Sequence, residues 1–350
     1  MTKKEPLPRE RPRPSSPGPE GPARGLLPGP SSPARPSRIA EPPDERVGPG
    51  TAVLLVGPAE PPEHLFRRLL GAYLAGAPEF VVRERGSLSP PTRDVVRTFC
   101  RRTRQPEILS EEEDTIRLHD LSFESPVSLD QRVQRMGRLV LEFHRDAVDS
   151  WSHLPLQDDG DWERRDDEVD REAWYIQRIA TLRLGGPGAV PGLLGSWTIA
   201  RSLERIADHA VVLGNTGQRL AALPHGQGPA TPLRQFHHQA MEHLEGALAA
   251  LDGDRANELL DTGDALAASG HSLADRLLPG VGGGVMPPAT AAAVGRILES
   301  IGRTIAYAQD IVQVALDRSI PVVPLDAPAR SGRPIGPGLR RDRFVSSPAR

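Results

Sequence analysis

From Ser128 onward, apolar residues recur at steps of three and four positions, and this periodicity constrains the fold more than any other feature of the chain. Residues three or four places apart lie on one face of an α-helix, so each such stripe predicts an amphipathic helix. Six stripes follow one another, and turns rich in glycine, proline or aspartate separate them. The stripes run from Leu129 to Trp151, Val169 to Ala180, Ile199 to Leu220, Leu233 to Leu251, Ala256 to Leu277 and Val294 to Ala315.

We therefore predict two tandem antiparallel three-helix bundles, at residues 128–222 and 231–320, joined by short loops. Ser128 and Gln131 form a capping box that begins the first helix. Thr231, followed by Pro232, has the residue types that begin a helix, so we expect the fourth helix to start there. The fifth stripe contains Gly263 and Gly270, which lower helix propensity and indicate close packing against a neighbouring helix.

Residues 50–124 have a different pattern, in which short apolar runs alternate with helical stripes. Runs of four to six apolar residues that are bounded by turn residues are typical of strands. The predicted order is βαβαββ, which is a small α+β domain. The strands are expected at 51–56, 79–83, 106–109 and 115–119, and the helices after Pro61 and Ser89.

The two ends of the chain, residues 1–49 and 321–350, are dense in proline, glycine, serine and arginine. Such segments bury too little apolar surface to offset the entropy lost on ordering, so we expect a disordered Pro/Arg-rich arm and a disordered basic tail. The overall fold class is thus mainly α: two three-helix bundles preceded by a small α+β domain, with disordered termini.

Composition excludes several classes of protein. The 350 residues are 38% apolar with a formal net charge of −3, which is not the basic surface of a general nucleic-acid binder. The chain has no uncharged apolar run of 18 residues and no apolar segment behind Lys3 and Lys4, so we expect neither a membrane span nor a secretory signal. The single cysteine, Cys100, is expected in the core of a protein from the reducing cytoplasm.

Two segments resemble a known family. The helix Ala200-Arg-Ser-Leu-Glu-Arg-Ile-Ala-Asp-His-Ala210 is similar to the signature helix of the PhoU family, with its Arg-x-x-Glu-Arg-x-x-Asp-x-Ala pattern. The run Asp166-Asp-Glu-Val-Asp170 resembles the acidic motif on the preceding helix of that family. Leu65 to Gly76 and Ser128 to Trp151 are similar to archaeal-type PhoU proteins, so the resemblance covers about residues 51–320.

The resemblance implies a cytoplasmic, non-enzymatic regulator of phosphate uptake and phosphate signalling. Its expected partners are subunits of a phosphate ABC transporter, a sensor histidine kinase, and further copies of itself. Docking is assigned to Arg201, Glu204, Arg205 and Asp208. Archaeal-type relatives commonly carry an AbrB-like DNA-binding domain, and the Pro/Arg-rich arm stands in its place here.

The acidic motifs also predict a metal site. Glu204 and Asp208 are four residues apart and share one helical face, as do Asp166 and Asp170. Carboxylate oxygens without nearby thiols suit hard cations, and by resemblance family members bind iron, zinc or other divalent ions with such patterns. We place this metal at Asp166, Asp170, Glu204 and Asp208, and no other cofactor is expected.

The alternative is that arginines neutralise these carboxylates without any metal. Arg201 and Arg205 lie on the same face as Glu204, and Arg171 lies four residues after Asp167. Exposed pairs of this kind contribute about 0–1 kcal/mol each. The sequence alone leaves both readings open.

The second repeat and the histidines carry weaker signals. Arg296 to Arg303 keeps Glu299 of the signature but has Arg303 in the place of the aspartate, and only Asp261 and Asp264 match the other motif. His209 is expected to face solvent. The histidines of the fourth predicted helix form no Glu-x-x-His pair, which a di-iron enzyme of the ferritin type would need; they are His237, His238 and His243.

Two functional alternatives stay open beside the regulatory adaptor. In a DNA-linked regulator of phosphate genes, the arginines of the arm or the run Arg340-Arg341-Asp-Arg343 would contact nucleic-acid phosphates. In a carboxylate-metal enzyme, the four motif carboxylates would hold the ion. We find no nucleophile elbow or phosphate-binding glycine loop, and the adaptor is therefore our leading hypothesis.

Overall fold

A computed structural model describes residues 50–121, 128–152, 159–184, 190–223, 225–278 and 286–320. The predicted arm and tail lie outside these residues, as do the segments to which the DNA-binding alternative assigns its phosphate contacts. The described residues belong to one compact unit that begins at Gly48.

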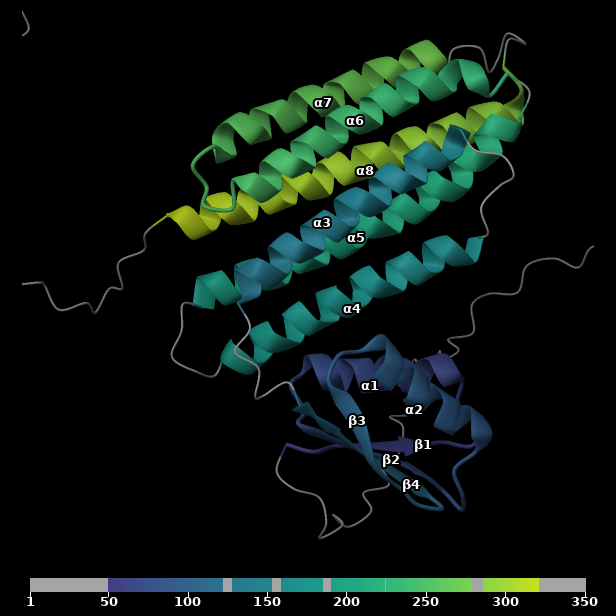
Figure 1. The fold of residues 1–350 in the computed structure, drawn as a ribbon, viewed down its shortest axis with the longest axis vertical. Coiled ribbons are helices and arrows are strands. Elements are labelled where there is room, and N and C mark those ends of the chain that lie inside the picture. Colours follow the sequence, from purple (N-terminus) through teal and green to yellow (C-terminus); the bar gives the residue numbers. More distant parts are fainter. Residues whose placement is uncertain are drawn as a thin grey trace, which may run out of the picture. The chain divides into compact units, whose positions relative to one another are not determined.

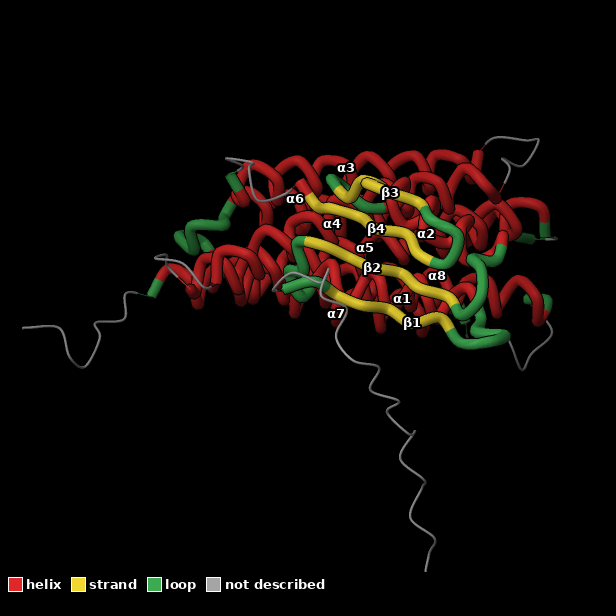
Figure 2. Tube along the Cα trace, turned by 90° about the horizontal axis from the view of Figure 1, so that it is seen from below, coloured by secondary structure: helices red, strands yellow, loops and turns green. Residues whose placement is uncertain are grey.

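The first part of this unit is a four-stranded sheet with two helices, in the predicted order βαβαββ. The strand order across the sheet is β1-β2-β4-β3; β1 and β2 are parallel and the other neighbours antiparallel (Figure 2). The elements are β1 (Ala52–Val56), α1 (Pro62–Leu74), β2 (Glu79–Glu84), α2 (Pro90–Arg102), β3 (Pro106–Glu111) and β4 (Thr115–Asp120).

The core of this α/β module lies between the sheet and its two helices. Alternate residues along a strand point to opposite faces, so one face of each of β1, β2 and β4 meets α1 and α2. Phe99 of α2 is at the centre, in edge-on contact with the rings of Phe66, Tyr73 and Phe80. Cys100 packs partly buried against this core, and burial raises the pKa of its thiol to about 11.

Six long helices follow, as the stripes predict, and they run side by side (Figure 1). Ser128 caps the first of them, where its hydroxyl accepts a hydrogen bond from the Gln131 N–H. The helices are α3 (Leu129–Asp149), α4 (Asp159–Leu184), α5 (Val190–Ala222), α6 (Gln227–Ala249), α7 (Ala256–Leu277) and α8 (Pro288–Ser319).

The two sets of three helices share one hydrophobic core. Its buried residues come from every helix from α3 to α8, and the third helices of the two sets, α5 and α8, pack along each other. The predicted close approach at the glycines of α7 is confirmed. A Cβ atom at Gly270 would lie 2.8 Å from Cζ of Phe236, and one at Gly263 would lie 2.6 Å from Cγ of Gln309.

The helix α6 begins earlier than we predicted. We expected Thr231 as its cap, but the helix starts at Gln227 and Pro232 lies inside it. Pro229 and Ala230 are buried. Burial of these residues favours the longer helix, and it outweighs the backbone hydrogen bond that proline removes.

The helix α4 connects the α/β module to the other helices. Its Trp174 completes the core of the module, and its Glu172 is fully buried between two arginines. The Glu172 carboxylate lies 2.8 Å from Arg104 Nη2, just after α2, and 3.2 Å from Arg132 Nη1 on α3. A buried carboxylate needs such partners, so these pairs help to set how α4 lies against both neighbours.

In the part of the chain that the structure describes, no helix is both long and apolar enough to cross a lipid bilayer.

Candidate functional site

The candidate site lies where α4 and α5 pack against each other. Asp166 and Asp170 are one turn apart on α4, and we call them the α4 acidic pair. The α5 ridge comprises Arg201, Glu204, Arg205 and Asp208. The structure brings the four predicted carboxylates close enough for Glu204 and Asp208 to influence the ionisation of the α4 acidic pair.

Burial, followed by the neighbouring carboxylates, raises the pKa of both members of the α4 acidic pair. For Asp166 the pKa is raised to about 7, and after burial the main cause is Asp208. For Asp170 the pKa is also raised to about 7, and after burial the main cause is Asp166. Removing a carboxylate from water disfavours its charged form, and like charges nearby add to the effect.

One oxygen of the pair has no hydrogen-bonding partner within the described residues. This is Oδ1 of Asp166, which is buried. Such an atom requires a proton, a water molecule or a cation, because an orphaned buried oxygen is costly. The cluster can therefore take up positive charge.

On α5, arginines neutralise part of the charge, as the metal-free reading proposed. Glu204 lies 3.3 Å from Arg201 Nη1 and 3.7 Å from Arg205 Nε, and only 15% of its side chain is exposed. Its arginine neighbours and the α4 helix account for this low exposure. Both arginines are themselves well exposed.

A further cation comes from the α/β module, and the sequence analysis missed it. Arg102, the last residue of α2, pairs with Asp167 and lies 3.4 Å from Asp170 Oδ2. Its guanidinium stacks 5.5 Å from the ring centres of Phe66 and Trp174. Arg102 and Asp170 are 68 positions apart in the sequence, and no local pattern around Arg102 indicates the contact.

The second repeat meets the site from α8. His209 stacks on Tyr307 of α8 with ring centres 6.0 Å apart, so this histidine is partly covered and does not simply face solvent. Burial lowers its pKa, and Arg303 also lowers it while Asp208 and Glu299 oppose the shift. On α7, Asp264 accepts a hydrogen bond of 2.8 Å from Gln309.

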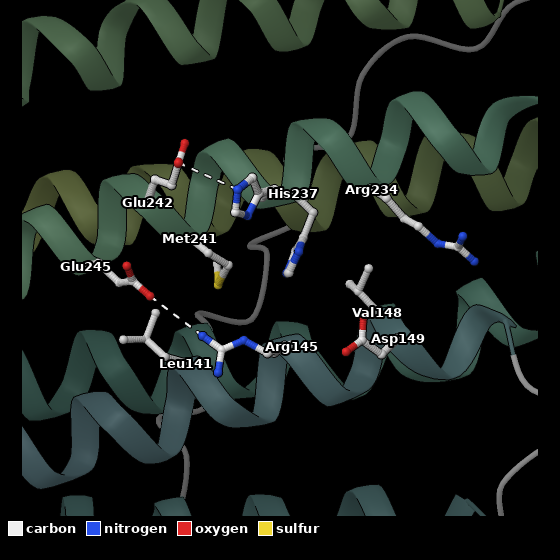
Figure 3. A pocket seen from close by; sticks show the side chains of 10 residues that line it. Leu141, Arg145, Val148, Asp149, Arg234, His237, Met241, Glu242 and Glu245 are labelled. Carbon is white, nitrogen blue, oxygen red and sulfur yellow. Dashed lines mark ion pairs between the residues drawn. The ribbon is translucent and has the colours of Figure 1, made fainter.

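The histidines of α6 lie elsewhere and point in different directions. His237 is buried against His144 of α3, whereas His238 is exposed and lies 3.6 Å from Glu242. A cavity of about 200 Å³ lies between α3 and α6 next to this pair (Figure 3). Its charged side chains occur as oppositely charged neighbours, such as Arg145 and Glu245 at 3.8 Å, so the cavity has no strong preference for one sign of ligand.

Replacing the α4 acidic pair by asparagine is expected to stabilise the protein at alkaline pH. Both folded-state pKa values are near 7 and the unfolded value is about 4, so the folded state keeps protons that the unfolded state releases. Stability therefore falls as the pH rises from about 4 to 7. With an allowance for residual solvent, we expect the double variant Asp166→Asn/Asp170→Asn to gain about 1–2 kcal/mol at pH 8 and nothing at pH 4.

Urea unfolding at both pH values measures this difference, and Asp161→Asn at an exposed position of α4 is the matched control. A double variant that is less stable than the unmodified chain at pH 8 would contradict this prediction. It would show that the ionised carboxylates stabilise the fold, for example through the ion pair between Asp170 and Arg102.

Comparison with known proteins shows which family this region resembles. Residues 133–215, which contain the α4 acidic pair and the α5 ridge, match the family model described as PhoU domain. The phosphate-specific transport system accessory protein PhoU homolog of Caulobacter vibrioides, from two strains, is 35% identical over 85 residues. That match covers 24% of this chain and 36% of the relative, so the chain spans about a third of the length of the relatives it matches. Residues 133–215 are thus similar in sequence to the PhoU domain, and this similarity covers the α4 acidic pair and the α5 ridge.

Proposed function

We propose that this protein is a non-enzymatic regulator of phosphate uptake and phosphate signalling that acts by binding other proteins. The α5 ridge carries the proposal. It lies within the PhoU domain, and its two arginines present their guanidinium groups to solvent beside a cluster of carboxylates. The printed name of the Caulobacter relatives, an accessory protein of phosphate-specific transport, supports the same role.

The physical basis for docking is that the ridge can exchange its ion-pair partners at low cost. Arg201 and Arg205 are largely exposed, so each can turn from Glu204 toward an acidic group on a partner while the other arginine stays beside this partly buried carboxylate. Glu204 then becomes available to a basic group on the same partner. Charged ridges of this kind mainly set the orientation and rate of association.

We expect subunits of a phosphate ABC transporter, a sensor histidine kinase, or both, to be retained by this chain from cells with ample phosphate. The variant Arg201→Glu/Arg205→Glu is expected to reduce retention at least tenfold, because it places like charges beside Glu204 and Asp208. Quantitative mass spectrometry after affinity capture measures the retention.

Arg255→Glu, which breaks an exposed ion pair with Glu258 at the start of α7, is the matched control and should leave retention unchanged. Recovery of neither transporter nor kinase with the unmodified chain would count against the proposed function.

Metal binding at the four carboxylates is the second candidate. The donor chemistry suits a hard cation, and the unpartnered Oδ1 of Asp166 favours one. However, no three histidine, cysteine, aspartate or glutamate side chains within the described ranges are grouped closely enough to hold an ion. Arg102, Arg201 and Arg205 also supply positive charge at this place.

The metal site therefore stays a prediction, and metal analysis of the purified chain tests it. Bound iron, zinc or another divalent ion should fall at least tenfold in Glu204→Ala/Asp208→Ala if these carboxylates are ligands. Equal metal content in both proteins would exclude the site. In that case the arginines are the counter-ions of the cluster.

A further inference from the structure

The first turns of α5 carry apolar side chains that the described residues leave exposed. Val190, Leu194 and Trp197 are 43%, 49% and 38% exposed, and their spacing of four and three places them on one face. We call these three residues the α5 apolar stripe. The chain has four tryptophans, and each of the other three is at most 8% exposed.

The α5 apolar stripe leads directly into the α5 ridge. Arg201 lies four residues after Trp197, so the same face of the helix changes from apolar to charged along the chain. Around the charged part, carboxylates outnumber guanidinium groups. The carboxylates are Asp166, Asp167, Asp170, Glu204 and Asp208, and the guanidinium groups are those of Arg102, Arg201 and Arg205.

The helix α8 ends near the first turns of α5, at the same end of the helices as the α5 apolar stripe. The helix α8 ends at Ser319, and the side chain of its Arg318 lies against Gly195 at the start of α5. The tail begins with apolar residues, Val322, Val323 and Leu325. Its later part is basic, with Arg330, Arg333, Arg340, Arg341, Arg343 and Arg350 against Asp326 and Asp342.

Along both the tail and the face of α5, apolar residues come first and charged residues follow. The tail carries a positive charge and the face of α5 a negative one. The tail is also long enough. From Trp197 to Asp208 the helix rises about 16 Å, and the eight steps from Leu325 to Arg333 span about 25 Å when extended.

We propose that residues 321–350 bind in cis along the outward face of α5, where they compete with the partner protein. The aliphatic residues of the tail cover the α5 apolar stripe, and its arginines lie over the acidic cluster. This inference rests on the proposed function, because the tail would regulate the same docking surface. A second copy of the chain fits less well, because two α5 helices paired through their stripes would leave both ridges uncovered.

Acrylamide quenching of tryptophan fluorescence tests the proposal, because Trp197 dominates the accessible signal. We expect the Stern–Volmer constant to rise at least twofold when the chain is ended at Ile320. Trp197→Phe in both chains should abolish the difference. A full-length variant, Val322→Ser/Val323→Ser/Leu325→Ser, should show the same rise without truncation.

A synthetic peptide of residues 321–350 should restore protection to the shortened chain. The peptide with Arg330→Glu and Arg333→Glu, the arginines that the tail length places over the acidic cluster, should bind at least tenfold more weakly, and added salt should weaken the original peptide. Far-ultraviolet circular dichroism is the control for folding, and the shortened chain should keep its helical spectrum.

Equal quenching in the long and short chains would overturn the proposal. Two other results would also overturn it: protection lost when residues 1–49 are removed, or protection that depends on protein concentration, which indicates a second copy. The quenching assay contains no partner protein. Equal quenching therefore rejects binding of the tail without testing the proposed function. The affinity capture tests the proposed function, and its result does not depend on the quenching result.

Discussion

Arg178→Met is expected to lower the free energy of unfolding by about 3–5 kcal/mol. Arg178 of α4 and Asp120 of β4 form an ion pair in which both side chains are fully buried. The guanidinium also donates to the carbonyl oxygens of Tyr73 and of Ala77, the latter at 2.8 Å, and lies 4.5 Å from the ring centre of Tyr73. Removing it takes the positive charge away from the buried Asp120 carboxylate. It also removes one hydrogen bond from the carbonyl oxygen of Ala77 and one from that of Tyr73, which still accepts from the Gly76 N–H.

Chemical denaturation measures the loss, and two variants interpret it. Arg178→Met/Asp120→Leu is expected to recover much of the stability, because neither charge then remains buried alone. Arg164→Met on the same helix, where the arginine side chain is 78% exposed, should change stability by less than about 0.5 kcal/mol. If Arg178→Met is as mild as Arg164→Met, this ion pair does not hold the α/β module to α4.

Acidification from pH 6.5 to 4 is expected to destabilise the contact between the two repeats. His144 of α3 and His237 of α6 are buried and stacked, with Nδ1 of His144 3.2 Å from Nε2 of His237. The other nitrogen of His144 lies 2.8 Å from the carbonyl oxygen of Ile206, which requires this nitrogen to be the donor. Nδ1 of neutral His144 is then an acceptor, so Nε2 of His237 carries the proton that lies between the two rings. Both histidines are therefore neutral in this arrangement.

Burial lowers the pKa of His144 to about 4 and that of His237 well below its usual value. The unfolded state, in which a histidine has a pKa of about 6.5, therefore binds more protons between pH 6.5 and 4. Stability conferred by neutral His144 is complete above pH 6.5 and is lost as the pH falls, by about 3 kcal/mol. His209 and His238 add to the lowering of these pKa values, whereas the α4 acidic pair changes stability in the opposite direction over this range.

A comparison of variants isolates the histidine pair from the acidic pair. In His144→Leu/His237→Leu, unfolding free energies measured at pH 6.5 and pH 4 should differ by at least about 3 kcal/mol less than in the unmodified chain, because neutral His237 adds to the loss calculated for His144. The loss of the bond to Ile206 is the same at both pH values and cancels. His238→Leu, at an exposed position, should keep the original pH dependence. If the difference between the unfolding free energies at pH 6.5 and pH 4 is the same in the double variant as in the unmodified chain, the histidine pair does not cause the loss of stability in acid.

The helices were predictable because the information that forms them is local. Apolar residues at steps of three and four residues define each stripe, and a cap such as Ser128 satisfies backbone N–H groups within one turn. The mainly α fold with a small α/β module followed from these patterns. The placement of Asp166 beside Asp170, and of Glu204 near Asp208, followed equally from the helical repeat.

Sequence reasoning failed where contacts join distant positions. The start of α6 was wrong because burial of Pro229 and Ala230 extends a helix that its cap residues would begin later. The sequence also did not indicate that His237 of α6 finds its partner, His144, on α3, 93 residues away. Neither outcome is encoded in the residues that flank these positions.

The sequence by itself determined the six helical stripes, the α/β module and the acidic motifs, because hydrogen bonding within helices and the facing of neighbours one turn apart act over a few residues. Only the tertiary structure decided that Arg102 reaches the acidic motif of α4, that Arg178 is buried with Asp120, and that both repeats share one core. These contacts depend on how whole elements fit together. Their charges become strongly coupled only after packing has removed the water between them.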